Sequence, residues 1–222
     1  DDIRNKVFSI AQTHNVVVIV PSFDRAKYWD LEGFRTITKD NIEGDYDKVI
    51  LAAGSTPAMP PIPGIDTTVL ASDYLTHQAT VGKKVVVIGA GLAGTEAACD
   101  IAGKEGDVTV VEMCPDILFT ANHCLNNDQH LRKMVKDRGV KVEANAKVTN
   151  ITPTSVTFER DGQTMTLECD TVLNAVGFRP NNQLEDLLDE KYDEVAVIGD
   201  AVAPRKILTA IHEGYHAIRV ME

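Results

Sequence analysis

The chain has 222 residues, and its 22 Lys+Arg against 33 Asp+Glu give a formal net charge of −11. Hydrophobic residues make up 44% and charged residues 25%, which is typical of a soluble globular protein. The acidic balance argues against a surface for nucleic acid or anionic membranes. No apolar run approaches the ~20 residues that span a bilayer.

The length fits one large domain or two small ones. The chain begins with neither a signal peptide nor an initiator Met, so we expect a fragment or a processed product. Four cysteines contain no C-x-x-C pair and match no zinc or iron–sulfur spacing; they are Cys99, Cys114, Cys124 and Cys169. Free thiols in a cytoplasmic protein are the simplest interpretation.

The first part of the chain predicts a buried strand at Val16–Val20, followed by a polar, hairpin-like stretch at Ser22–Gly44. Asp47–Gly54 is a second strand that ends in small residues. Four prolines interrupt Ser55–Gly64, which excludes regular structure there and indicates a connection between domains.

The middle of the chain alternates strands and helices. Strands are predicted at Lys84–Ile88, Val108–Glu112 and Val140–Ala144, with helices at Leu92–Lys104 and Asn126–Arg138. The strand at Lys84–Ile88 is almost wholly apolar, as expected where both faces of a sheet are covered.

Toward the C-terminus, Asp161-Gly162 predicts a hairpin turn within Ile151–Leu167, and Thr171–Val176 is a strand ending at Gly177. Val195–Asp200 is the last strand unit. A helix follows, with Pro204 near its first turn and an apolar stripe at Ile207, Ile211, Tyr215 and Ile218. Strands that alternate with helices predict an α/β fold with largely parallel sheets, and no internal repeat is present.

The sequence Gly89-Ala90-Gly91-Leu92-Ala93-Gly94 fits the G-x-G-x-x-G fingerprint of dinucleotide-binding folds. It follows a predicted strand and opens a predicted helix, which is the context that the fingerprint requires. Gly89 allows a tight turn, Gly91 lets a pyrophosphate approach the backbone, and Gly94 lets helix and strand pack closely. The phosphates would lie against the N-terminus of the helix.

Glu112 ends the next strand and would accept hydrogen bonds from the ribose 2′-hydroxyl. Its charge would repel a 2′-phosphate, and the next residues, Met113 to Asp116, contain no Lys or Arg. NAD(H) is therefore predicted over NADP(H). The alternative is a glycine-rich turn that binds nothing.

Four motifs in one order carry a resemblance to a known family. They are Val49-Ile50-Leu51-Ala52-Ala53-Gly54-Ser55-Thr56-Pro57, the fingerprint at Gly89, Asn174-Ala175-Val176-Gly177-Phe178-Arg179-Pro180-Asn181, and Ile198-Gly199-Asp200-Ala201. This order resembles flavoproteins of the pyridine-nucleotide–disulfide oxidoreductase type. The tail from Gly199 to Tyr215 is more narrowly similar to the C-terminal half of the NADH:flavin oxidoreductases, which include 2-enoate reductase and 2,4-dienoyl-CoA reductase.

In such flavoproteins a Rossmann-like NAD domain is inserted into a discontinuous FAD-binding domain. The resemblance therefore implies FAD-binding segments at 1–81 and 178–222 around an NAD domain at 82–177. The implied NAD-binding residues are Gly89, Gly91, Leu92, Ala93, Gly94, Glu112 and Gly177. The implied FAD-binding residues are Ala53, Gly54, Gly199 and Asp200; a plain helix N-cap is the other interpretation of Asp200. No residue is assigned to catalysis or to a metal.

The chain also departs from the family pattern. It has no G-x-G-x-x-G before Val49, and both the N-terminal flavin barrel and the cysteine cluster of many members are absent. The FAD site is thus expected to be incomplete. The implied partners are the two dinucleotides and the missing barrel and first FAD motif. Assembly into a homo-oligomer is a further possibility that the sequence leaves open.

These features together predict an electron-input module that binds NADH and passes hydride to FAD, for reduction of an activated C=C bond in the intact enzyme. A disulfide reductase-like fragment and a non-catalytic NAD-binding module are the alternatives. His212-Glu213-Gly214-Tyr215-His216 also satisfies the zinc-protease pattern H-E-x-x-H, but Gly214 weakens the helix and few residues follow to supply a third ligand.

Overall fold

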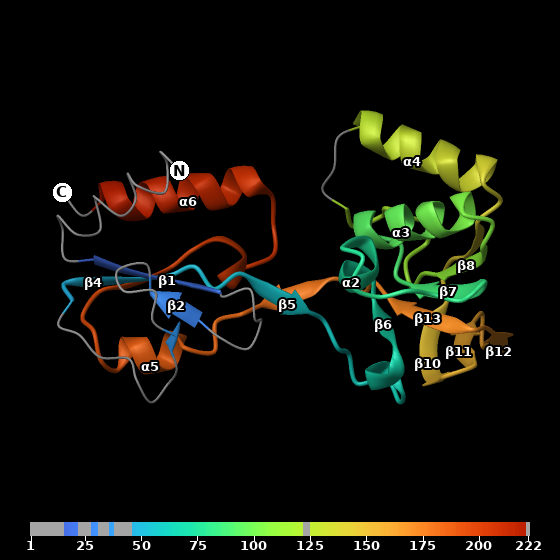
Figure 1. Cartoon of the computed structure of the whole chain (residues 1–222), viewed down its shortest axis with the longest axis horizontal. Coiled ribbons are helices and arrows are strands. Elements are labelled where there is room, and N and C mark those ends of the chain that lie inside the picture. The colour runs from blue at the N-terminus through green and yellow to red at the C-terminus, as the bar shows by residue number, and fades with distance from the viewer. Residues whose placement is uncertain (1–15, 22–27, 31–35, 38–45, 122–124, 221–222) are drawn as a thin grey trace. The chain divides into compact units, whose positions relative to one another are not determined.

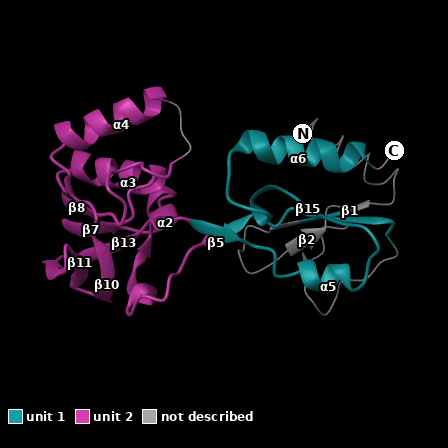
Figure 2. Cartoon of the chain, turned by 180° about the vertical axis from the view of Figure 1, so that it is seen from behind, with its two compact units in different colours: residues 1–56, 178–222 teal, residues 57–177 magenta. Residues whose placement is uncertain are grey.

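The computed structural model describes residues 16–21, 28–30, 36–37, 46–121 and 125–220. The chain forms two compact units, unit 1 (residues 1–56 and 178–222) and unit 2 (residues 57–177), coloured teal and magenta in Figure 2. The first boundary falls in the proline-rich segment rather than at 81/82. The reason is that residues 57–81 supply a strand and a helix to unit 2 and none to unit 1.

Unit 1 contains a five-stranded sheet in the order β15-β4-β1-β2-β3. Its strands are β1 (Val16–Pro21), β2 (Tyr28–Asp30), β3 (Thr36–Ile37), β4 (Lys48–Leu51) and β15 (Val195–Val197). The central strands β15, β4 and β1 are parallel, whereas β2 and β3 add antiparallel pairs. Of the hairpin-like stretch predicted at 22–44, only β2 and β3 lie within the described residues.

Two helices cover opposite faces of this sheet, α5 (Glu185–Asp189) and α6 (Ile207–Arg219) (Figure 1). Alternate strand residues face each helix. Val49 and Leu51 pack with Leu188 on the α5 side, and Ile50 packs with Ala217 and Ile218 on the α6 side. The period of two along β4 thus places both of its faces in a core.

Unit 2 is built on a parallel sheet in the order β6-β13-β7-β8-β9. Its strands are β6 (Val69–Leu70), β7 (Lys84–Ile88), β8 (Asp107–Val111), β9 (Lys141–Glu143) and β13 (Thr171–Asn174). Three helices lie on one face (Figure 1): α2 (Ala71–Leu75), α3 (Leu92–Gly103) and α4 (Leu125–Asp137). An antiparallel sheet covers the other face, formed by β10 (Lys147–Thr152), β11 (Ser155–Arg160) and β12 (Gln163–Glu168).

The apolar composition of β7 follows from this layering. Val85 and Val87 pack in the core under the helices, and Val86 and Ile88 pack against the antiparallel sheet. The hairpin predicted at Asp161-Gly162 is also confirmed, because both residues have positive φ, 51° and 74°, between β11 and β12. The prediction of an α/β fold with largely parallel sheets is confirmed.

The chain passes between the units through β5 (Ser55–Pro57) and β14 (Phe178–Pro180), which pair as a two-stranded sheet. The prolines of Ser55–Gly64 were predicted to exclude regular structure, which is wrong at its start, because the three-residue strand β5 includes the first of these prolines, Pro57. A short 3-10 turn, η1 (Ile65–Thr67), follows in unit 2, and a second one, η2 (Gly199–Ala201), precedes α6 in unit 1. Helix α6 begins at Ile207, three residues after Pro204.

Among the described residues, Cys99, Cys114 and Cys169 are free thiols, and Cys124 lies outside them. No helix in the described part of the chain is both long and apolar enough to cross a membrane.

Candidate functional site

The glycine-rich turn of unit 2 lies at the carboxyl end of β7, between that strand and α3. Gly89 has φ +96°, and a Cβ there would lie 2.6 Å from the carbonyl oxygen of Ala175. A Cβ on Gly94 would lie 2.0 Å from the carbonyl oxygen of Gly89. Packing inside unit 2 therefore requires glycine at both positions.

Gly91 differs from these two glycines. It has an ordinary φ of −68° as the N-cap of α3, and a Cβ there would meet nothing within 4 Å. The first turn of α3 contains no acidic side chain, and no side chain caps it. Open space therefore adjoins the backbone N–H groups of Leu92 and Ala93, where the helix dipole favours an anion.

Glu112, directly after β8, is held by two backbone donors. Its Oε2 accepts a hydrogen bond from the Ala90 N–H at 2.6 Å, and its Oε1 accepts one from the Cys114 N–H at 2.7 Å. The Cys114 thiol is a further hydrogen-bond partner of this carboxylate, and of its roughly four acceptor positions at least one remains. The side chain is thus fixed beside the glycine-rich turn and can still accept a hydrogen bond from a diol.

Gly177 lies three residues beyond β13, the strand next to β7. Its φ is +101°, and its carbonyl oxygen accepts a hydrogen bond from the Ala58 N–H at 2.9 Å. Buried Asn174 ties the same two segments together, because its Nδ2 donates to the Ala58 carbonyl at 3.1 Å. The predicted NAD-binding residues of unit 2 therefore all lie at the carboxyl ends of β7, β8 and β13.

Unit 1 has its own cavity, of about 480 Å³, at the carboxyl ends of β4 and β15. Three residues predicted for FAD line it: Gly54, Gly199 and Asp200. Ala53, the fourth, is 2% exposed and does not line the cavity. Its carbonyl oxygen accepts a hydrogen bond from Asn181 Nδ2 at 3.2 Å.

Asp200 joins the two strand ends of this cavity. Its Oδ2 accepts a hydrogen bond from Ser55 Oγ at 3.3 Å, and its Oδ1 accepts one from the Arg205 N–H at 3.0 Å. The second bond spans the residues before α6, so Asp200 closes a loop rather than capping the first turn of α6, whose N-cap is Lys206. The N-cap interpretation of Asp200 is therefore not the one that the structure supports.

Sequence reasoning missed several residues of the unit 1 cavity. Arg205 and Lys206 give it positive charge, and Ile207 and Ile211 give it an apolar wall. Two adjacent cations after the Gly-Asp motif were a usable signal for an anion-binding cavity. By contrast, the side-chain contact of Ser55 with Asp200 spans 145 positions and leaves no local pattern.

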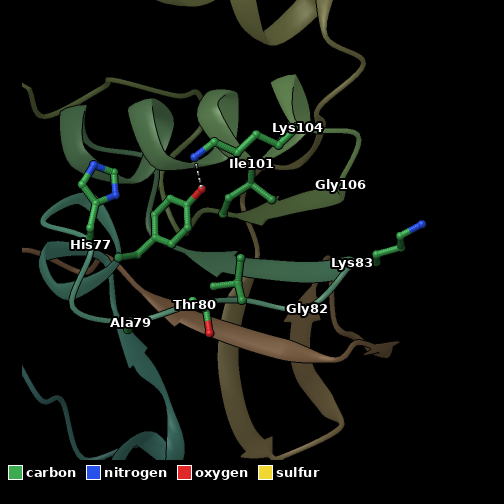
Figure 3. Close-up of a pocket in the computed structure, with 10 residues that line it drawn as sticks. His77, Ala79, Thr80, Gly82, Lys83, Ile101, Lys104 and Gly106 are labelled. Atoms are coloured by element: carbon green, nitrogen blue, oxygen red, sulfur yellow. Dashed lines mark hydrogen bonds between the residues drawn. The ribbon is translucent and has the colours of Figure 1, made fainter.

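Unit 2 also contains a cavity, of about 470 Å³, which lies at the opposite end of α3 from the glycine-rich turn (Figure 3). Tyr74 donates a hydrogen bond to Asp100 at 2.6 Å, and Lys104 Nζ lies 2.6 Å from the same carboxylate. The hydrogen bond from Lys104, with that from Tyr74, lowers the pKa of Asp100, and burial raises the pKa of Tyr74. The side chain of Lys83 points away from the cavity (Figure 3), and no sequence-predicted site residue lines it.

The H-E-x-x-H segment lies on α6, where His212 and His216 are exposed. Glu213 between them is bonded instead to the backbone of Gly199 and to Arg205. Within the part of the chain that the structure describes, no group of three or more His, Cys, Asp or Glu could hold a metal ion.

Comparison with known proteins places these two units in context. The family model described as pyridine nucleotide-disulphide oxidoreductase matches residues 2–213. Cinnamate reductase of Clostridium sporogenes is 30% identical over 184 residues, and the match covers 82% of this chain and 28% of that protein. NADH oxidase of Thermoanaerobacter brockii is 35% identical, with 76% of this chain and 27% of that protein covered.

A solved structure, a 2-naphthoyl-CoA reductase in complex with 2-naphthoyl-CoA, has a TM-score of 0.69 and 30% identity. The match covers 81% of this chain and 28% of that one. The chain thus spans between a quarter and a third of the length of these relatives.

FAD and NAD(H) are the cofactors that these relationships indicate. The residues present are compatible with both, since unit 2 leaves open space at Gly91 and unit 1 combines cations with an apolar wall. The resemblance seen in the four sequence motifs is confirmed, and the chain belongs to the pyridine nucleotide-disulphide oxidoreductase family.

Proposed function

We propose that this chain is the electron-input part of a flavin-dependent oxidoreductase, which binds NADH in unit 2 and FAD in unit 1. One observation carries the proposal: each unit has a site at the carboxyl ends of its parallel strands, where dinucleotides bind to open α/β sheets. FAD, when bound, supplies the ring that accepts a hydride from NADH and returns two electrons to an acceptor.

In unit 2, the glycine-rich turn and α3 would hold the pyrophosphate of NADH. The N–H groups of Leu92 and Ala93 would donate to it, and the absence of a Cβ on Gly91 would leave room for it. Glu112 would accept a hydrogen bond from the adenosine ribose. Its negative charge would disfavour a 2′-phosphate, so NADH is preferred to NADPH.

In unit 1, Asp200 would accept hydrogen bonds from the hydroxyl groups of the flavin dinucleotide. Lys206 would attract its phosphates, and Ile207 and Ile211 would contact an apolar part of the molecule. Gly54 and Gly199, with φ of +69° and +66°, let the backbone line the cavity without side chains.

For the intact enzyme, we propose reduction of an activated C=C bond. The support comes from the relatives, since cinnamate reductase and 2-naphthoyl-CoA reductase are named for unsaturated substrates conjugated to a carbonyl group. No side chain of this chain is assigned as acid, base or nucleophile. Its part in the reaction is to bind and orient the two dinucleotides.

The test uses the 222-residue chain, NADH and a two-electron dye, 2,6-dichlorophenolindophenol, without oxygen and with or without added FAD. We expect NADH to bind in both cases and the dye to be reduced, one molecule per NADH, only when FAD is present. If both dinucleotides bind but the dye is not reduced, the chain is a non-catalytic binding module. If NADH does not bind at all, the assignment of unit 2 is wrong.

A further inference from the structure

Glu213 makes two contacts with the turn that precedes α6. Its Oε2 accepts a hydrogen bond from the Gly199 N–H at 2.7 Å, and its Oε1 accepts one from Arg205 Nη2 at 2.5 Å. The side chains of Glu213 and Arg205 are 28% and 37% exposed, so the pair is partly shielded from water. Helix α6 thus reaches back to the strand end that lines the unit 1 cavity.

Arg205 extends this connection to Asp200. Its backbone N–H donates to Asp200 Oδ1 at 3.0 Å, and its guanidinium donates to the carbonyl oxygens of Ala203 and Gly199 at 3.1 and 3.4 Å. Glu213 therefore fixes the guanidinium that folds the loop around Asp200. The carboxylate of Asp200 owes its direction to this loop and to Ser55.

Gly199 is the residue that most needs such support. Its φ of +66° lies in the left-handed region, where it begins the short turn η2. A single side-chain acceptor, Glu213, takes up its N–H group. Without that acceptor the N–H would lose its partner, and the turn could relax toward other conformations.

We propose that Glu213 is a positioning residue for FAD, which acts with Arg205 to hold the Gly199–Asp200 turn in its binding geometry before the cofactor arrives. The inference rests on the proposed function of the unit 1 cavity as the FAD site. Preorganisation of this kind raises affinity, because the turn is ordered before binding rather than during it.

The chain contains a matched control. Arg160 and Glu143 form an ion pair in unit 2 with side-chain exposures of 33% and 25%, close to those of Arg205 and Glu213. Glu143→Gln breaks an Arg–Glu pair of similar burial without touching unit 1. This variant therefore shows how much the loss of such an ion pair changes FAD binding when the pair lies outside unit 1.

The experiment titrates FAD into wild type, Glu213→Ala, Glu213→Gln and Glu143→Gln by quenching of flavin fluorescence. We expect Glu213→Ala to weaken FAD binding at least about tenfold. Glu213→Gln should lie in between, because its carbonyl can still accept from Gly199 while its charge is lost. Glu143→Gln should bind FAD as wild type does, and all four proteins should bind NADH equally.

Amide exchange of Gly199, followed by NMR without any cofactor, gives a second measurement. We expect it to be faster in Glu213→Ala than in wild type and unchanged in Glu143→Gln. If wild type binds FAD and both Glu213 variants bind it equally well, the positioning role is wrong while the FAD site stands. If wild type does not bind FAD, the proposed FAD site fails and this inference falls with it.

Discussion

The carboxylate of Glu112 accepts a hydrogen bond from the backbone N–H of Ala90, in the middle of the glycine-rich turn, at 2.6 Å. The contact joins the end of β8 to the loop that follows β7. Because Cys114 donates to the other oxygen, the carboxylate is held in one orientation. The residue proposed to recognise the ribose thus also supports the loop proposed to hold the phosphates.

Glu112→Ala is expected to weaken NADH binding by about 10- to 100-fold, since it removes an acceptor for the ribose and leaves the Ala90 N–H without its partner. The preference for NADH over NADPH should narrow, because the charge that repels a 2′-phosphate is gone. Titrations followed by nicotinamide fluorescence measure both effects. Glu159→Ala, an exposed change on β11, serves as control. An unaltered preference in Glu112→Ala would refute the assigned role.

Two glycines of the same turn should respond differently to alanine. Gly91→Ala is expected to leave the stability of unit 2 unchanged, because its Cβ would enter open space, yet to weaken NADH binding at least about tenfold. Gly94→Ala is expected to cost about 3 kcal/mol in the free energy of unfolding, because its Cβ would lie 2.0 Å from the Gly89 carbonyl oxygen.

Urea unfolding and NADH titration of the two variants separate these effects. If Gly91→Ala binds NADH like wild type, the pyrophosphate does not lie at this turn. If Gly94→Ala is as stable as wild type, the close approach of α3 and β7 is not required for the fold.

Much of unit 2 could be predicted because its signals are local. The apolar run at Lys84–Ile88, the glycine-rich turn and Asp161-Gly162 each determine their own backbone within a few residues. The bounds of α3 and α4 also agree with prediction to within a residue or so. Elements of this kind depend on periodicity and turn chemistry, which a single sequence displays.

The remaining features depend on contacts between distant parts of the chain. Nothing near residue 57 shows that the segment after it joins the sheet of unit 2 through β6. Similarly, the sequence places Glu213 in the zinc-protease pattern H-E-x-x-H, and only the structure shows that its carboxylate contacts the Gly199 N–H instead. Helix α6 begins at Ile207, three residues after the Pro204 that was expected near its first turn, because Asp200 and Glu213 hold the loop at 203–206. No local sequence pattern indicates these two contacts.

Asp200→Asn should separate charge from geometry in the unit 1 cavity. The amide can still accept from the Arg205 N–H and can donate to the Ser55 hydroxyl, so the loop should keep its shape. We expect stability within about 0.5 kcal/mol of wild type and FAD binding weakened about tenfold or more, since a neutral amide is a poorer acceptor for hydroxyl groups.

Asp193→Asn, a change at an exposed residue of unit 1 that lies outside the cavity, is the control. The measurements are urea unfolding and flavin fluorescence. Equal FAD affinity in Asp200→Asn and wild type would contradict the role of the carboxylate.

The Tyr74–Asp100–Lys104 cluster of unit 2 should make stability depend on acid pH. The pKa of Asp100 is lowered in the folded chain, first by the hydrogen bond from Lys104 and then by that from Tyr74. The stabilisation is therefore complete above the ordinary carboxyl pKa and is lost as the pH falls through the lowered value. The carboxylate is 45% exposed, so the effect should not exceed about 0.5 kcal/mol.

Urea unfolding at pH 7 and pH 3 measures this effect in wild type, Tyr74→Phe and Asp100→Asn. Tyr74→Phe should be less stable than wild type at pH 7 by about 0.5–1 kcal/mol, and the difference should begin to shrink at pH 3, as the pH approaches the lowered pKa of Asp100. Asp137→Asn on α4 is the control, because Asp137 pairs with Lys133 four residues earlier and has no tyrosine beside it. A difference between Tyr74→Phe and wild type that is the same at both pH values would show that the hydroxyl acts through packing and not through the charge of Asp100.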